Sequence, residues 1–308
     1  MSRPVSSRSS LPDNTSAVTR RDFIKKTAYL GAGLACTVGP AAWATKFEPH
    51  WIETTRVNLP IQNLHPAFDG LTLAQISDLH IGGWMTEKRL AEVVDTVNSL
   101  QPDLVAITGD FVTRAPQQYR HTIAEGLARF KPRIDAFGVL GNHDHWTHPK
   151  TIRDALAKSG VQELNNSFHT LHRDGGTLHI CGLDDAWMEM SDVSRVLETL
   201  PSKGTAILLA HEPDPADDYA KTGRFAAHLA GHTHGGQIRA PFVGALHLPK
   251  FGEKYDAGLY RVGATPEKQI QLYVNRGVGM VWPYVRLNCR PEVTLFTLRA
   301  AGILPALP

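Results

Sequence analysis

Five short polar blocks in this chain carry the carboxylate, amide and imidazole side chains that bind divalent cations in proteins. The blocks are Asp78-Leu79-His80, Gly109-Asp110, Gly141-Asn142-His143-Asp144, His211 and Gly231-His232-Thr233-His234. Each block alone is a weak signal, because a polar turn or a single histidine is more often structural than functional. Oxygen donors mixed with several neutral imidazoles favour Mn, Zn, Fe or Co, whereas a calcium site would lack so many imidazoles.

The chemistry that suits such a ligand set is hydrolysis of a phosphate ester. Two divalent cations about 3.5–4 Å apart can hold both the attacking and the departing oxygen, and they lower the pKa of a bound water toward about 7. The resulting metal-bound hydroxide would attack phosphorus, so no serine or cysteine nucleophile is required. Two cations so close need a shared anion, and Asp110 is the best-placed carboxylate for that role.

His143 and Asp144 are the candidate catalytic residues. His143 follows Asn142 directly, so we expect its imidazole to point into the same cleft and to stabilise phosphoryl charge or protonate the leaving oxygen. We expect Asp144 to orient this imidazole and raise its basicity. The alternative is that His143 is a structural histidine beside the metal ligands.

Every polar block follows a short apolar run that is typical of a buried strand. Strands whose carboxyl ends meet at one edge of a sheet would bring the blocks together. Leu90, Val93, Val94 and Val97 recur at helical spacing, which predicts an amphipathic helix over residues 86–100. Further helices are predicted over 151–158 and 191–199, and the alternation of strands and helices indicates an α/β fold. The strand-like runs are residues 71–76, 104–107, 136–140, 206–210 and 225–230.

The ordered set of blocks resembles the calcineurin-like metallophosphoesterases, whose motifs are D-x-H, GD, GNH[DE], H and GHxH. This resemblance implies a four-layer α/β/β/α sandwich of two mixed sheets, a catalytic domain over residues 67–300, and two divalent metal ions as cofactors. It implies two ligand groups that share one carboxylate. Asp78, His80, Asp110 and His234 would hold one metal, and Asp110, Asn142, His211 and His232 would hold the other.

Finer features of the motifs indicate a branch of that family. Thr113 stands where the purple acid phosphatases carry a metal-binding tyrosine, so no tyrosinate–iron site is expected. The third block reads GNHD, whereas protein phosphatases and secreted nucleotidases usually have GNHE. The segments 210–214, 231–237 and 273–279 are similar to a bacterial phosphodiesterase branch whose members often carry a twin-arginine export signal or an N-terminal membrane segment.

The N-terminus independently predicts export. Arg20-Arg21 open a basic segment, an apolar run covers residues 28–42, and Ala42-Trp43-Ala44 offers small residues for cleavage. We therefore predict a twin-arginine signal peptide over residues 1–44, an encounter with the twin-arginine translocase, and a location in the periplasm or on the outer face of the cytoplasmic membrane. The alternatives are an uncleaved anchor or a surface turn leading into a core helix. Residues 45–66 are predicted to form a linker or an edge strand, and residues 301–308 a C-terminal tail.

Composition excludes some partners and leaves others open. A net charge of +2 without a run of Lys or Arg gives no indication of a nucleic-acid partner. Cys181 and Cys289 are predicted to be buried thiols rather than a disulfide. Bulky apolar residues follow several blocks, and they either line a groove for an apolar substituent or cap the core and face a membrane. These residues are Trp84, Met85, Trp146, Trp187, Met188 and the segment 280–282.

The favoured function is a metal-dependent phosphodiesterase acting on a phosphoester substrate outside the cytoplasmic membrane. Lipid and cell-envelope phosphodiesters are the candidate substrates, and association with a membrane surface is a candidate property. A phosphomonoesterase would use the same metals. An enzyme similar to the UDP-diacylglucosamine pyrophosphatases is a further alternative, although its substrate lies on the cytoplasmic side and export argues against it. A non-catalytic metal-binding protein is the remaining alternative; it would be expected to lack a ligand, and none is missing.

Overall fold

The computed structural model describes residues 39–302. The chain divides into Met1–Trp43 and Ala44–Pro308, and the larger unit contains the sheets and helices that follow. Most of the predicted signal peptide, residues 1–38, lies outside the described residues, as does the end of the predicted tail, residues 303–308. Within residues 39–302, no helix has both the length and the apolar composition needed to cross a bilayer.

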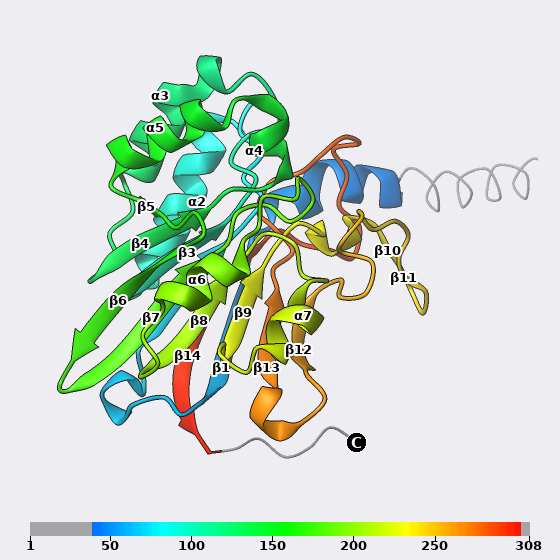
Figure 1. The fold of residues 1–308 in the computed structure, drawn as a ribbon. Helices are drawn as coiled ribbons and strands as arrows, with labels where there is room; N and C mark the ends of the chain where they lie inside the picture. Colours follow the sequence, from blue (N-terminus) through cyan, green and yellow to red (C-terminus); the bar gives the residue numbers. More distant parts are fainter. Residues whose placement is uncertain (1–38, 303–308) are drawn as a thin grey trace, which may run out of the picture. The chain divides into compact units, whose positions relative to one another are not determined.

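Two six-stranded sheets form the centre of the larger unit (Figure 1). In the first sheet β1 is an edge strand parallel to β14, β14 is antiparallel to β2, and β2 to β5 are parallel. The order across this sheet is β1 (Glu53–Gln62), β14 (Glu292–Ala301), β2 (Thr72–Ile76), β3 (Leu104–Thr108), β4 (Asp135–Val139) and β5 (Gln162–Glu163).

The second sheet is also mixed, with antiparallel strands at both edges. Strands β13, β9, β8 and β7 are parallel, while β12 and β6 run antiparallel to their neighbours. The order is β12 (Gly258–Val262), β13 (Ile270–Val274), β9 (Ala227–Ala230), β8 (Thr205–Leu209), β7 (Gly176–Gly182) and β6 (Ser167–Arg173). A separate two-stranded hairpin consists of β10 (Arg239–Ala240) and β11 (Gly244–Ala245).

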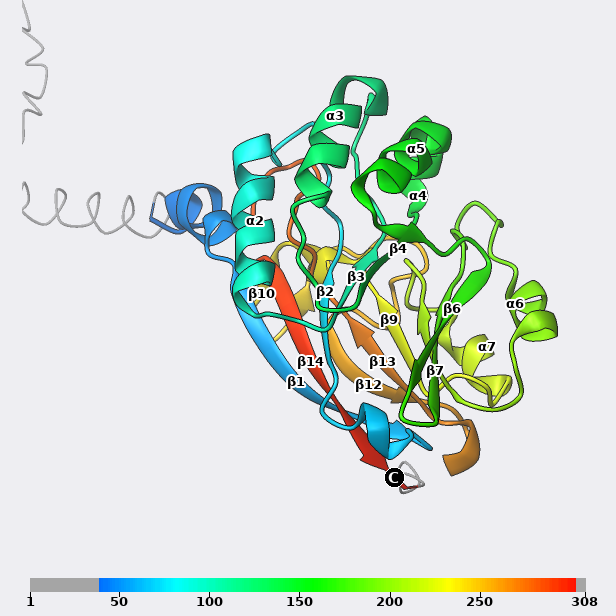
Figure 2. The ribbon, with the colours of Figure 1, turned by 90° about the vertical axis from the view of Figure 1, so that its left-hand side faces the viewer.

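Helices cover the outer faces of both sheets, which gives four layers (Figure 2). One apolar core joins the first sheet to its helices, a second lies between the sheets, and a third joins the second sheet to its helices. The predicted α/β/β/α sandwich of two mixed sheets is therefore confirmed.

The helices are α2 (Glu87–Ser99), α3 (Pro116–Leu127) and α5 (Pro149–Ser159) on the first sheet, α6 (Val193–Thr199) and α7 (Ala216–Lys221) on the second, and α4 (Asn142–Thr147) near the strand ends. Short turns occupy Trp43–Phe47, Glu48–His50, Pro66–Phe68, His234–Gly236 and Pro266–Lys268.

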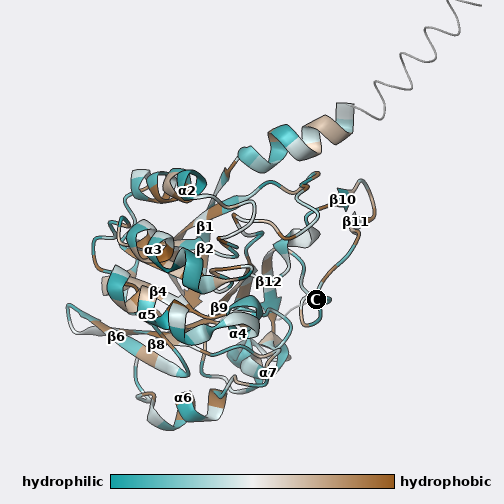
Figure 3. Ribbon diagram, turned by 90° about the horizontal axis from the view of Figure 1, so that it is seen from above, coloured by the Kyte–Doolittle hydropathy of each residue, from teal (hydrophilic) through white to brown (hydrophobic). Residues whose placement is uncertain are grey.

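The predicted helix over residues 86–100 is α2, whose N-cap is Thr86 and whose apolar stripe is buried. Leu90, Val93, Val94 and Val97 belong to the same apolar core as residues of β2 and β3. Figure 3 shows hydrophilic and hydrophobic residues alternating along the ribbon of α2. Helices α3 and α7 were not predicted. Helix α3 begins after Ala115, which has a left-handed backbone, and its sequence is mostly polar, so it lacks the apolar stripe that identifies α2.

Candidate metal centre

The five polar blocks meet at one edge of the two sheets. Asp78, Asp110 and Asn142 follow the parallel strands β2, β3 and β4, while His211 and His232 follow the parallel strands β8 and β9. The carboxyl ends of parallel strands lie at the same edge, which explains the convergence. All seven predicted ligands are buried there, none with more than 5% of its surface exposed.

The first group of predicted ligands contains two imidazoles that face each other. His80 Nε2 lies 3.0 Å from His234 Nε2, and the two rings stack. Asp78 Oδ1 lies 3.3 Å from the same His234 nitrogen. Burial lowers the pKa of His80 to about 3 and that of His234 well below its usual value, so both rings are neutral. Burial raises the pKa of Asp78 to about 6, a cost that a bound cation would remove.

The second group has imidazoles whose tautomers are fixed by backbone carbonyls. His211 Nδ1 donates to the Thr108 carbonyl at 2.7 Å, and His232 Nε2 donates to the Lys250 carbonyl at 2.8 Å. The remaining nitrogens, His211 Nε2 and His232 Nδ1, face each other at 3.2 Å. The buried Asn142 Oδ1 has no hydrogen-bond partner among the described residues. Two facing nitrogens and an unsatisfied amide oxygen are the donors that a divalent cation requires.

Asp110 lies between the two groups. Its Oδ2 is 3.5 Å from His80 Nε2 in the first group and 3.3 Å from His211 Nε2 in the second, while Oδ1 accepts the His143 amide at 2.9 Å. Burial opposes ionisation of Asp110, but the positive charge of His211 in its protonated form holds the pKa of Asp110 well below its usual range. A bound cation would supply such a positive charge with His211 neutral. This position is the one expected of a shared carboxylate, and the residues present fit two divalent cations.

The ligand turns have strained backbones. Five of the seven predicted ligands have positive φ, which is uncommon outside glycine and gathers at functional sites. They are Asp78 at 54°, His80 at 48°, Asp110 at 55°, His232 at 72° and His234 at 51°. Gly231 is required for a different reason, since a Cβ there would collide with the Ser77 hydroxyl and the Asp78 carboxylate. The packing of these turns leaves little freedom to shift any ligand.

His143 lies where the sequence predicts it, at the wall of the cavity beside the ligands. Its ring packs edge-on against His80 and close to Trp146. The Nδ1 atom is 3.4 Å from the Thr113 carbonyl, which can only accept, so Nδ1 carries the proton in this contact. That leaves Nε2 as the ring nitrogen able to exchange a proton with a substrate.

Asp144 does not orient His143, so that prediction is wrong. The Asp144 carboxylate is fully buried and accepts hydrogen bonds from the backbone amides of Gly141, Phe111 and Val112, at 3.1–3.2 Å. No hydrogen bond or ion pair among residues 39–302 joins it to His143. The physical reason is capping: Asp144 is the third residue of α4, and its carboxylate turns back to the unpaired amides at the helix start. These hydrogen bonds join the turn that contains Asp110 to the turn that contains Asn142.

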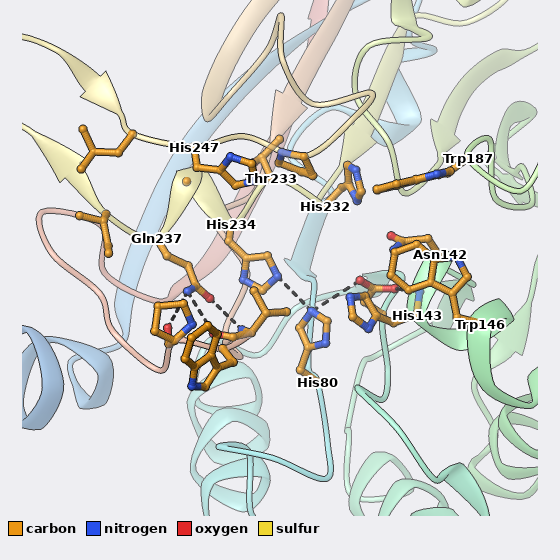
Figure 4. Close-up of a pocket in the computed structure, with 18 residues that line it drawn as sticks. His80, Asn142, His143, Trp146, Trp187, His232, Thr233, His234, Gln237 and His247 are labelled. Carbon is orange, nitrogen blue, oxygen red and sulfur yellow. Dashed lines mark hydrogen bonds and ion pairs between the residues drawn. The ribbon is translucent and has the colours of Figure 1, made fainter.

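A cavity of about 490 Å³ opens over the ligands and has apolar walls. Figure 4 shows Trp146 and Trp187 on one side of the imidazoles and Gln237 and His247 on the other. Of the bulky residues singled out from the sequence, Trp146, Trp187, Val281 and Trp282 line the cavity. The others do not, since Met85 and Met280 are buried in the fold and Trp84 packs against Arg89.

Three residues that sequence reasoning missed support these walls. Gln237 donates from Nε2 to the carbonyls of Val281 and Pro283 and accepts the Val281 amide. The buried Arg286 donates to four backbone carbonyls in the β13–β14 loop. Glu212 accepts the amides of Ala186 and Trp187. Gln237 and Glu212 adjoin predicted ligand blocks, which is a weak signal, whereas nothing in the sequence marks Arg286.

Both cysteines in the described part of the chain are free and buried, as predicted. Cys289 Sγ lies 3.1 Å from the His234 carbonyl and packs against the ligand turn. Burial raises the pKa of the Cys181 thiol to about 12. Neither thiol is therefore a nucleophile for the cavity.

Comparison with known proteins agrees with this geometry. The calcineurin-like phosphoesterase family matches residues 71–236, which include all seven predicted ligands. The chain belongs to this family.

Three bacterial relatives are similar over nearly the whole chain. The uncharacterized metallophosphoesterase YkuE of Bacillus subtilis is 34% identical, covering 92% of this chain and 99% of the relative. The phosphodiesterase YaeI of Escherichia coli is 29% identical, covering 91% and 99%. The UDP-2,3-diacylglucosamine pyrophosphatase LpxG of Chlamydia trachomatis is 28% identical, covering 87% and 96%.

Proposed function

We propose that this protein is a phosphodiesterase that uses two divalent cations, one held by each ligand group, with Asp110 shared between them. The single observation that carries the proposal is the position of Asp110 Oδ2, within 3.5 Å of an imidazole nitrogen from each group. When bound, the cations would supply Lewis-acid activation of water and neutralise charge on the phosphate. Reconstitution with single metals distinguishes Mn, Zn, Fe and Co.

The chain's own residues position and protonate the substrate. The carbonyls of Thr108 and Lys250 hold the His211 and His232 rings in one tautomer, so their free nitrogens stay directed at the centre. His143 Nε2 lies at the cavity wall and is the group able to stabilise phosphoryl charge or donate a proton to the departing oxygen. The predicted ligands themselves are at most 5% exposed, so they contact solvent only through the cavity.

The walls of the cavity favour a diester over a monoester. A phosphodiester carries two organic substituents, and the cavity has apolar side chains to receive both. Trp146 and Trp187 lie on one side of the imidazoles, and Val281 and Trp282 belong to the segment whose Val281 amide is bonded to Gln237 on the other (Figure 4). A monoester would leave one of these walls without a partner. The relative YaeI of Escherichia coli is a phosphodiesterase, which supports the same assignment.

The test is to strip the protein with a chelator, add Mn, Zn, Fe(II), Co or Mg singly, and compare bis(p-nitrophenyl) phosphate with p-nitrophenyl phosphate. We expect activity to vanish on chelation, to return with two equivalents of metal, and to favour the diester. Metal-independent turnover, or full activity in His232→Ala, would contradict the two-cation assignment. A higher kcat/KM for the monoester would instead identify a phosphomonoesterase.

A second candidate is hydrolysis of a lipid-linked diphosphate. The relative LpxG is a UDP-2,3-diacylglucosamine pyrophosphatase, and the apolar cavity walls suit an acyl-bearing substrate as well as a diester. The two candidates separate on one measurement, the ratio of kcat/KM for a nucleoside diphosphate lipid to that for a long-chain phosphodiester.

We also propose that the protein is exported by the twin-arginine translocase and acts in the periplasm or at the outer face of the cytoplasmic membrane. The support is the Arg20-Arg21 pair followed by the apolar run over residues 28–42. Replacing both arginines by lysine keeps the charge but removes the recognised pair. Fractionation of cells should then find the variant retained in the cytoplasm, and unchanged export would reject this route.

A further inference from the structure

Two loops beside the cavity expose large apolar side chains on one surface. The first loop, residues 235–252, contains the β10–β11 hairpin, and the second, residues 276–291, joins β13 to β14. Four side chains project from them, namely Phe242, Val243, Leu246 and Trp282, with exposed fractions of 110%, 74%, 61% and 79%. We call these four residues the apolar rim. Because Leu246 and Trp282 also line the cavity, the rim is continuous with its apolar wall.

The two loops are held together as one unit. The Arg239 amide donates to the Leu287 carbonyl at 2.9 Å, and the Leu287 amide donates to the Gln237 carbonyl at 2.9 Å. Asn288 Nδ2 donates to the Arg239 carbonyl at 3.0 Å. The hairpin stands out from the body of the fold at one side (Figure 1). The apolar rim therefore belongs to two loops that are joined by hydrogen bonds, not to a single loose loop. These bonds hold the rim in its exposed position.

The charged side chains of these two loops are all positive. Neither residues 235–252 nor residues 276–291 contain Asp or Glu, although they contain five cations. Arg239 and Arg276 pair with carboxylates of neighbouring segments, and Arg286 is buried. Lys250 and Arg290 form no ion pair within residues 39–302, and each instead lies over an aromatic ring. Loops that carry an exposed apolar rim together with cations outside any ion pair complement an anionic, partly apolar surface.

We infer that the apolar rim docks this enzyme on an anionic lipid bilayer, with Phe242 and Val243 inserted at the boundary of headgroups and acyl chains. The inference rests on the proposed function, because a lipid substrate in the bilayer would then meet the cavity mouth directly. A bilayer fits better than a folded protein, since Phe242 and Val243 form a small apolar tip on a short hairpin and the rim includes an exposed tryptophan, a residue type enriched at membrane interfaces.

Insertion is tested with a fluorophore at the hairpin tip. The full chain carries Cys36→Ser and Val243→Cys, labelled with an environment-sensitive dye; Cys181 and Cys289 are buried. The matched control is Ile134→Cys, because Ile134 is 44% exposed and precedes β4 at the end opposite Asn142. With phosphatidylglycerol vesicles we expect a blue shift and quenching by brominated lipid at 243 but not at 134, weakened by salt. Vesicle-bound protein without any change at 243 would overturn the inference.

Function at the bilayer is tested with the double variant Phe242→Ser/Val243→Ser and the control Ile134→Ser. Neither tip residue lines the cavity. We expect turnover of a long-chain phosphodiester in phosphatidylglycerol vesicles to fall about tenfold or more in the double variant, as burial of two apolar side chains is lost. Turnover of soluble bis(p-nitrophenyl) phosphate should stay unchanged, and the control should match the natural chain in both assays.

The outcomes separate docking from the proposed function. Because residues 1–44 are common to every variant, differences between variants belong to the rim. Insertion at 243 without hydrolysis of any diester would refute the phosphodiesterase proposal and leave the docking surface intact. Hydrolysis of vesicle lipid that is unaffected by the double variant would refute docking. A changed oligomeric mass in sedimentation, with vesicle binding unaffected, would make the rim a protein interface and also overturn the inference.

Discussion

The ligand turns and the apolar rim border the same cavity but are built in different ways. Predicted ligands such as Asp78 and His211 are completely buried, and carbonyls and tight glycine turns fix their positions. Phe242 and Trp282 are exposed and are fixed only through their backbones. Chemistry at the ligands depends on the position of single atoms, whereas contact at the rim depends on apolar area. Substitutions should therefore cost far more at the ligands than at the rim.

The largest effect is expected from Asp110→Asn. The amide keeps the shape but removes the negative charge that faces His80 and His211, and with it the carboxylate that we propose two cations share. We expect kcat/KM to fall by about a thousandfold or more, with metal content reduced in elemental analysis. Asp95→Asn is the control, because Asp95 is an exposed carboxylate paired with Arg129 on the helical layer. Activity within tenfold of the natural chain would mean that Asp110 is not shared.

The next largest effect is expected on the free energy of unfolding and not on catalysis. Arg286→Met keeps much of the side-chain stem but leaves the carbonyls of Arg276, Gly277 and Gly279 without their buried donor. We expect the free energy of unfolding to fall by about 3 kcal/mol in denaturant titration. The control Arg299→Met removes a half-exposed cation and should cost less than about 1 kcal/mol. Equal costs for the two variants would show that Arg286 does not hold the second loop.

His143→Gln tests proton donation at the cavity wall. Loss of a general acid matters most when the leaving oxygen is a poor leaving group. We expect kcat for an alkyl phosphodiester to fall about a hundredfold, and kcat for bis(p-nitrophenyl) phosphate to change much less. If the two substrates lose equal activity, His143 acts on the phosphoryl charge or on structure and not as the acid.

The sequence is sufficient to predict that the seven candidate ligands converge, since their blocks follow apolar strands whose carboxyl ends meet at one edge. The five predicted strands are β2, β3, β4, β8 and β9, with ends that differ by no more than two residues. The role of Asp144 could not be predicted, because a capping carboxylate and an orienting one look alike until the helix start is known. The positive φ values of the ligand turns were equally hidden, because they depend on contacts between distant loops such as Gly231 against Ser77.

Gln237→Glu tests how far the cavity wall depends on the ligand turn. The carboxylate still accepts the Val281 amide, but it cannot donate to the carbonyls of Val281 and Pro283 and is repelled by them. We expect KM for a bulky diester to rise about tenfold with kcat and metal content little changed. Gln118→Glu, on the exposed face of α3, is the control. A fall in kcat with lost metal would place Gln237 with the ligands instead of with the wall.

The smallest effect is a pH dependence of the free energy of unfolding. It comes from an ion pair between α4 and the loop that follows β7. His145 Nε2 on α4 lies 2.6 Å from Asp184 Oδ1 after β7, and both side chains are nearly inaccessible. Burial opposes protonation, but the bond to Asp184 raises the pKa of His145 above its usual 6.5. A raised folded-state pKa means that the stabilisation is complete below pH 6.5 and is lost as the pH rises through the raised value. The difference in free energy of unfolding between the natural chain and His145→Gln should thus shrink as the solution becomes alkaline. His172→Gln, at an exposed position on β6, should show no such trend. A difference that grows with pH would mean that the histidine is neutral in the folded protein and that α4 is held to the second sheet without this ion pair.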